Sequence, residues 1–170
     1  MSKTKIMTSA KRSKPYLITY LVAVAIPLLV GLLSTLVTKG NMAIYTEMQK
    51  PPLAPAPWVF PVVWTLLYTL MGISSATAVI NRKDDNTKSL KSALEFYTLS
   101  LILNFGWSII FFNMEAYFSA LVWLAILVWT VVKTVAYYFK VSRSAALLQL
   151  PYLLWLAFAF YLNAFYAFLM

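Results

Sequence analysis

The sequence contains no cysteine and no histidine, and this double absence removes several kinds of chemistry. Without cysteine there is no disulfide framework, no thiolate nucleophile and no thiolate-ligated metal. Without histidine there is no imidazole for acid–base catalysis, no usual zinc site and no histidine-ligated haem. We therefore expect no metal site and no required cofactor.

Charged residues are also scarce. They make up 11% of the 170 residues, whereas hydrophobic residues make up 62%, and the mean hydropathy is +0.76. Soluble domains are about 25% charged and about 45–50% apolar, so this composition predicts an integral membrane protein of one domain. The few acidic residues are expected in loops or near helix ends, which leaves no carboxylate inside the membrane for proton-coupled transport. They are Glu47, Asp84, Asp85, Glu95 and Glu115.

The net charge of +9 raises the question of a nucleic-acid partner. Nucleic-acid sites cluster basic residues on one face with interleaved aromatic residues. Here the lysines and arginines instead flank long apolar runs, where such residues set the orientation of a protein in the membrane. We therefore expect a lipid bilayer and no nucleic acid as a partner.

Five apolar runs are each long enough to span a bilayer, which takes about 20 helical residues. The sequence thus predicts an all-α bundle of five transmembrane helices at about 16–38, 58–80, 89–112, 116–140 and 143–169.

Residues 1–15 are expected to be a disordered basic tail in the cytoplasm. The first apolar run exceeds the ~7–15 residues of a signal-peptide core, so we expect a transmembrane helix and not a cleaved signal peptide. Asn113 is a plausible cap for the fourth helix. Short connections after the second, third and fourth helices predict antiparallel neighbours.

The distribution of basic residues predicts the topology. With the N-terminus inside, twelve of the fourteen lysines and arginines lie on the inner side, and only Lys39 and Lys50 lie outside. This bias predicts an inner N-terminus and an outer C-terminus, because positive charges remain on the cytoplasmic side. Residues 39–57 then form an outer loop.

That loop is rich in proline, with five of the chain's eight prolines between Pro51 and Pro61. Proline fixes φ and has no N–H, so the loop should be stiff and extended until a helix begins near Trp58. A stiff loop that leads into an aromatic helix suggests a lid over a flat-walled pocket. The simpler interpretation is that the prolines end helices and the aromatic residues pack; the residue types alone favour neither.

Three of the predicted helices carry an aromatic face with one or two polar groups. The apolar pocket that such faces could enclose would suit a flat ligand. The other tryptophans, Trp58, Trp123 and Trp129, fit an aromatic belt at the membrane surface. The faces comprise Trp64, Thr65 and Tyr68; Asn104, Trp107, Ser108 and Phe111; and Tyr152, Trp155, Ala159 and Asn163.

Three motifs along the chain resemble, in their order and spacing, those of a known family. The first runs from Tyr45 through the prolines to Trp64, Tyr68 and Gly72; the second is residues 103–112, LNFGWSIIFF; the third is residues 150–159, LPYLLWLAFA, followed by Leu162-Asn163. In these motifs and their spacing the chain resembles the tryptophan-rich sensory protein family, also called the translocator protein or peripheral benzodiazepine receptor family. The resemblance covers about residues 16–168.

The resemblance implies a homodimeric five-helix membrane protein that binds porphyrins such as protoporphyrin IX or haem-type tetrapyrroles, and it looks like a bacterial member in the cytoplasmic membrane. Gly72 and Ala76 offer a small-residue spacing that could serve a dimer. Animal members carry a cholesterol-recognition motif at the end of the last helix. No basic residue follows Arg143 here, which puts sterol binding in doubt. The implied ligand-binding residues are Tyr45, Pro55, Trp64, Tyr68, Asn104, Trp107, Ser108, Trp155 and Ala159.

Three functions remain open. The leading one is a porphyrin receptor with a transport or stress-sensing role. A second is an enzyme that promotes light- and oxygen-dependent breakdown of protoporphyrin, as is thought for some family members; Trp64 and Trp155 would then be its catalytic residues. A third is a structural subunit whose aromatic faces bind partner helices.

Overall fold

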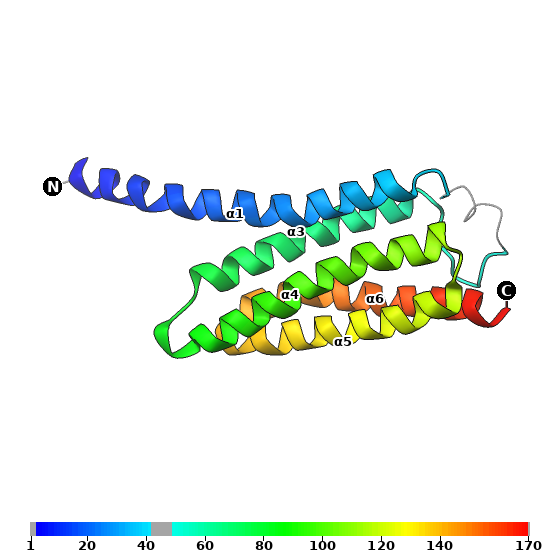
Figure 1. Ribbon diagram of the computed structural model, residues 1–170. Helices are drawn as coiled ribbons and strands as arrows, with labels where there is room; N and C mark the ends of the chain where they lie inside the picture. Colours follow the sequence, from blue (N-terminus) through cyan, green and yellow to red (C-terminus); the bar gives the residue numbers. More distant parts are fainter. Residues whose placement is uncertain (1–2, 42–48, 170) are drawn as a thin grey trace.

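In the computed structural model, which describes residues 3–41 and 49–169, the chain is a bundle of long helices (Figure 1). Within these residues five helices are long and apolar enough to cross a membrane, which confirms the predicted all-α membrane bundle. The helices are α1 (Lys3–Thr38), α3 (Val59–Ile80), α4 (Thr87–Ser108), α5 (Tyr117–Val141) and α6 (Arg143–Leu169). A short 3-10 turn, η1 (Asp84–Asn86), precedes α4, and a π-helical turn, η2 (Ile109–Asn113), follows it.

The first helix differs from the prediction at its start. Its apolar span is Tyr16–Thr38, as expected, but α1 begins at Lys3, so the structure continues the helix through most of the tail predicted to be disordered. Residues 3–14 contain no glycine or proline, and Pro15, at the junction with the apolar span, lies inside the helix without ending it. The end of the basic tail is thus a boundary of polarity and not of secondary structure.

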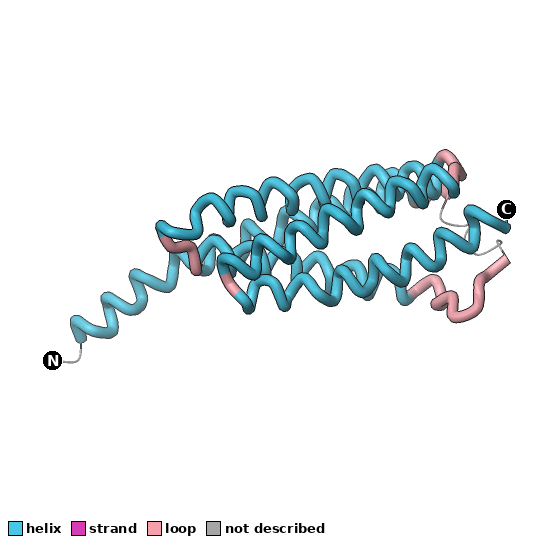
Figure 2. The backbone as a smooth tube through the Cα atoms, turned by 90° about the horizontal axis from the view of Figure 1, so that it is seen from below, coloured by secondary structure: helices cyan, strands magenta, loops and turns pink. Residues whose placement is uncertain are grey.

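The helices form a closed ring in which each packs on two others. Going around the ring, α1 packs on α3, α3 on α6, α6 on α5 and α5 on α4, and α4 returns to α1 (Figures 1 and 2). The prediction that α3 and α4 would be close neighbours is wrong, because they share little contact despite their short connection. The α3 helix instead lies between α1 and α6, so segments distant in sequence build one wall of the bundle.

Close approach of α1 and α3 depends on Gly72. A Cβ atom at this position would clash with the backbone of Val24 and lie 2.6 Å from the carbonyl oxygen of Ala23. Ala76, one turn further along α3, is also buried within the chain, at 1% exposure. These two small residues therefore serve contacts inside one chain. The predicted homodimer then rests on the family resemblance and not on this spacing.

The bundle is tightly packed at one end and hollow at the other. On α3 the buried residues begin at Leu67 and continue to Ala78. There they join a core that includes the buried tyrosines Tyr97, Tyr138 and Tyr152. The hydroxyl of Ser74 donates to the carbonyl oxygen of Ala145 at 2.7 Å and links α3 to α6 in this region. The first half of α3 is less buried and faces the cavity described below.

Candidate functional site

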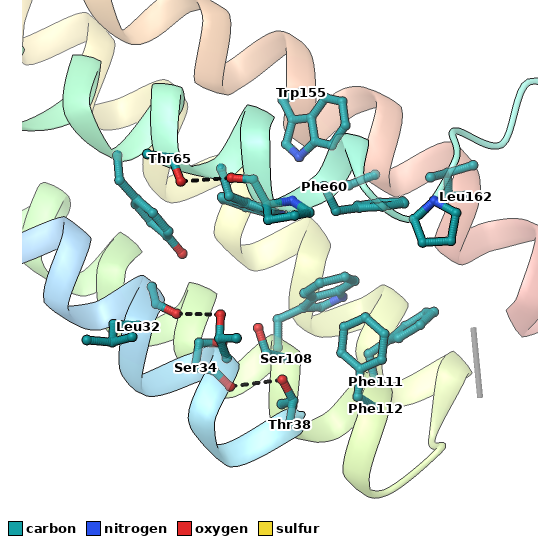
Figure 3. Close-up of a pocket in the computed structure, with 18 of the residues that line it drawn as sticks. Leu32, Ser34, Thr38, Phe60, Thr65, Ser108, Phe111, Phe112, Trp155 and Leu162 are labelled. Carbon is teal, nitrogen blue, oxygen red and sulfur yellow. Dashed lines mark hydrogen bonds between the residues drawn. The ribbon is translucent and has the colours of Figure 1, made fainter. Parts of the chain in front are cut away.

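A cavity of about 530 Å³ lies among α1, α3, α6 and the junction of α4 with η2 (Figure 3). This volume is within the roughly 300–1,000 Å³ of small-molecule sites. Among the described residues, α5 contributes none to its lining, so α5 supports the bundle from outside the site. Figure 3 shows Phe60 and Trp155 on one wall and Ser34, Ser108 and Phe111 on the opposite wall.

Six of the nine predicted site residues line this cavity: Trp64, Tyr68, Trp107, Ser108, Trp155 and Ala159. Asn104 lies behind the wall, where it holds Tyr68. Pro55 is not among the lining residues, whereas Pro57, from the same loop, is. Tyr45 lies outside the described residues. Residues from all three predicted faces therefore meet at one cavity, whereas Tyr152 of the third face lies in the buried core and not in the lining.

Tyr68 is fixed from two sides at the inner end of the cavity. The side-chain amide of Asn104 donates to the Tyr68 hydroxyl at 2.6 Å, and both side chains are buried. On the other side, a Cβ atom at Gly31 of α1 would clash with the Tyr68 ring. Glycine at position 31 thus lets the ring pack directly against α1, and Asn104 holds its hydroxyl.

One cavity wall is a connected set of aromatic rings. The Trp64 and Tyr68 rings are stacked, with centroids 5.2 Å apart and an interplanar angle of 29°. The Trp155 ring meets Trp64 edge-on at 6.5 Å and 86°, and Phe60 meets Trp155 edge-on at 6.0 Å. Such contacts stabilise a fixed arrangement of faces and edges, which gives the wall a rigid shape.

The opposite wall is held by Asn163 of α6. The Trp107 indole N–H donates to the side-chain oxygen of Asn163 at 3.0 Å, and the Asn163 amide donates to the carbonyl oxygen of Tyr117 at 2.9 Å. Trp107 in turn stacks on Phe111 at 5.0 Å. Phe111 belongs to the π-helical turn η2, and such turns occur frequently at functional sites.

The cavity offers few polar groups to a ligand. The hydroxyls of its threonines and of Ser108 donate to carbonyl oxygens of their own helices. No charged residue is among the described lining residues. The indole N–H groups of Trp64 and Trp155 make no hydrogen bond to any described residue, so they remain available as donors. An aromatic surface with so few donors suits a flat, largely apolar ligand.

Two sets of hydrogen bonds hold together the end of the bundle that carries the proline-rich loop. Asn113 does not cap α5 as predicted, since its side chain accepts from Asn41 at 3.1 Å and donates to the carbonyl oxygen of Val37 at 3.2 Å. These bonds fasten the end of α1 to η2. The Tyr161 hydroxyl donates to the carbonyl oxygen of Pro52 at 2.7 Å, which fastens the proline-rich loop to α6.

The contribution of α1 to the site was not foreseen. Gly31, Ser34 and Thr38 line the cavity, and their spacing of three and four residues places them on one helix face. Small and hydroxyl-bearing residues at helical spacing in an otherwise apolar span were the available signal. Phe60, Phe112 and Tyr166 also line the cavity and belonged to no predicted set.

Trp123 does not behave as a residue of an aromatic belt. Its indole N–H donates to the carbonyl oxygen of Leu103 on α4 at 2.7 Å. Its ring covers Gly106, where a Cβ atom would lie 2.9 Å from the ring. Trp123 therefore joins α5 to α4 directly behind the cavity wall.

Comparison with known proteins agrees with the architecture. Residues 23–169 match the TspO/MBR family. The tryptophan-rich protein TspO of Chlorobaculum tepidum is 37% identical over 130 residues, which cover 76% of this chain and 81% of the relative. The tryptophan-rich protein TspO of Archaeoglobus fulgidus is 40% identical over 121 residues, with 70% and 74% covered. The human translocator protein is 38% identical over 119 residues, with 70% of each chain covered. The chain is an integral membrane protein that belongs to the TspO/MBR family.

Proposed function

We propose that this protein is a membrane receptor for porphyrins, and that it uses the bound porphyrin in the sensory or translocator role for which its relatives are named. The observation that carries the proposal is the cavity wall formed by Trp64, Tyr68 and Trp155. A stacked pair of rings beside a perpendicular ring presents both a face and an edge to a planar aromatic molecule. The protein itself requires no cofactor in this proposal, and the porphyrin is its ligand.

The distribution of polarity supports one orientation of the ligand. A porphyrin carries carboxylates on one edge and is apolar over the rest of its ring. The inner end of the cavity is closed by the buried pair of Tyr68 and Asn104, which offers no cation. Lys39 is exposed directly after Thr38, the last lining residue of α1. The carboxylate edge would therefore lie at the outer mouth.

Titration of the purified protein with protoporphyrin IX in the dark tests the proposal. Binding should quench tryptophan fluorescence to saturation at one porphyrin per chain, and Trp64→Ala and Trp155→Ala should weaken it. A chain that binds no protoporphyrin, or binds it equally after both substitutions, is not a receptor that uses this wall. A structural subunit would give that result.

A second candidate function is light- and oxygen-dependent breakdown of protoporphyrin. The contact of Trp64 with Trp155 favours it, because adjacent indoles that line the same cavity can both reach one bound ring. Illumination of the saturated protein in air distinguishes the two functions. Loss of the Soret band with a new product, faster than for free protoporphyrin, supports the enzyme. An unchanged spectrum supports a receptor alone.

A further inference from the structure

A second aromatic cluster lies on α5 and α4, away from the cavity. Trp129, Lys133, Tyr137 and Lys140 follow one another on α5 at spacings of three or four residues, which places them on one stripe. Phe96 of α4 inserts its ring between the two aromatic members. Its centroid lies 5.7 Å from that of Trp129, edge-on, and 5.7 Å from that of Tyr137, nearly parallel. We call these five residues the lysine stripe.

Each lysine of the stripe rests on a ring. The Lys133 ammonium lies 5.6 Å from the Trp129 ring centroid, and the Lys140 ammonium lies 5.0 Å from that of Tyr137. Cation–π contacts attract a cation but do not neutralise its charge. Neither lysine pairs with a carboxylate of a described residue, since Glu95 on the adjacent helix pairs with Lys91 at 3.9 Å. The stripe therefore carries two positive charges without a counter-ion from the described part of the chain.

The stripe runs along α5 from the hydrocarbon core to the level of the lipid headgroups. At 1.5 Å per residue α5 is about 38 Å long, which exceeds the ~30 Å of the core, so its last turns reach the headgroup region. Lys133 lies about 12 Å from the end of the helix at Val141 on the same rise, and Lys140 lies at that end. The surface is uncovered by other helices, because Trp129 is 51% exposed and Val132 is 45% exposed.

We propose that the lysine stripe is a binding site for an anionic phospholipid, with Lys140 on the phosphate, Lys133 adding positive charge about two turns deeper, and the three rings against the glycerol and upper acyl chain. Charge complementarity selects this occupant. An ammonium donates strong, charge-assisted hydrogen bonds to a phosphate oxygen. A zwitterionic lipid carries a cationic group of its own, which the two lysines of the stripe would repel. The site is independent of the porphyrin proposal, because α5 contributes no described residue to the cavity.

Brominated lipids test the site, because bromine on an acyl chain quenches a tryptophan that it contacts. The full-length protein in detergent is titrated with brominated phosphatidylglycerol or brominated phosphatidylcholine, and tryptophan fluorescence is followed. Phosphatidylglycerol should quench at lower mole fraction, and Trp129→Phe should remove the part of the quenching that shows this preference. Lys133→Gln with Lys140→Gln should reduce the preference by about fivefold for each lysine, since one basic residue near the membrane surface contributes about that factor.

Lys83→Gln with Lys88→Gln is the matched control. Both of these lysines are exposed and lie on the predicted inner side, and their replacement lowers the net charge by the same two units. The control should keep the preference. Equal loss in both double variants would overturn the site in favour of general surface charge. Equal quenching of the parent protein by both lipids would also overturn it. Dissociation of an oligomer in the stripe variant, without any lipid preference in the parent, would assign the stripe to a second copy instead.

Discussion

Two buried tyrosines differ in a single hydrogen bond. The Tyr68 hydroxyl accepts from Asn104 at 2.6 Å, whereas the Tyr138 hydroxyl has no hydrogen-bond partner among the described residues. Both rings belong to the same core and both are at most 6% exposed. Removal of a hydroxyl should therefore have opposite consequences at these positions.

Tyr68→Phe is expected to destabilise the protein by about 1–3 kcal/mol, because it leaves the buried Asn104 amide without this partner. Tyr138→Phe is expected to be neutral or stabilising, since it removes a polar atom that gains no bond in the fold. Thermal unfolding followed by circular dichroism in detergent measures both. A Tyr138→Phe variant less stable than Tyr68→Phe would contradict the assignment of these hydroxyls.

Replacement of Trp64 or Trp155 tests the cavity wall. Either change to alanine removes stacking and apolar contact, and truncation of such a residue costs about 1.4 kcal/mol or more, so porphyrin affinity should fall about tenfold or more. Phenylalanine should retain much of the affinity, because a π face remains. Fluorescence titration of folded variants gives the dissociation constants.

Trp129→Ala is the matched control for these variants, because Trp129 is exposed on α5 and lines no part of the cavity. It should bind porphyrin like the parent. Trp123, which the sequence assigned to the same aromatic belt as Trp129, is unsuitable as a control because it supports α4 behind the wall through its hydrogen bond to Leu103. If Trp129→Ala loses binding and Trp64→Ala does not, the ligand lies elsewhere.

At the scale of elements, the pairing of α1 with α3 depends on the absence of a side chain. Gly72→Ala places a methyl group against the backbone of Val24, which cannot rotate away. Overpacking of this kind costs about 1–3 kcal/mol, and it should also displace α1 from the cavity that it lines. Lower thermal stability with weaker porphyrin binding is the expected result.

Gly40→Ala is the comparison at this scale. No atom lies within 4 Å of a Cβ built at Gly40, and no described glycine of the chain has a positive φ. The free energy of unfolding of the Gly40→Ala variant should remain within about 0.5 kcal/mol of that of the parent. If both glycine variants behave alike, close approach of the two helices is not what position 72 provides.

At the scale of the whole molecule, the five spans require the ends of the chain to lie on opposite sides of the membrane. In Figure 1 α1 begins at one end of the bundle and α6 finishes at the other. The basic residues predict that the N-terminus lies on the inner side. A reporter active only in the cytoplasm should work when fused to the N-terminus, and one active only outside should work at the C-terminus. The reverse pattern would refute the orientation.

The sequence by itself determined the number, approximate limits and membrane character of the helices. This follows from the bilayer, which requires about 20 consecutive apolar residues and satisfied backbone hydrogen bonds from each span. It also determined the aromatic faces around Trp64, Trp107 and Trp155, because residues at helical spacing share a face whatever lies opposite. Six predicted residues consequently reappear at the cavity.

Only the tertiary structure decided what each face meets. Lipid is as apolar as the helix surfaces, so burial of apolar residues does not determine which helices pack together. Helix pairing depends instead on the size and shape of residues at single positions. Gly72 admits α1 beside α3, and this pairing brings Ser34 and Thr38 into the site and separates α3 from α4. The hydrogen-bond partners of Asn104 and Asn113 could not be predicted from the sequence either. A side-chain amide bonds to whichever partner the folded bundle brings within about 3 Å.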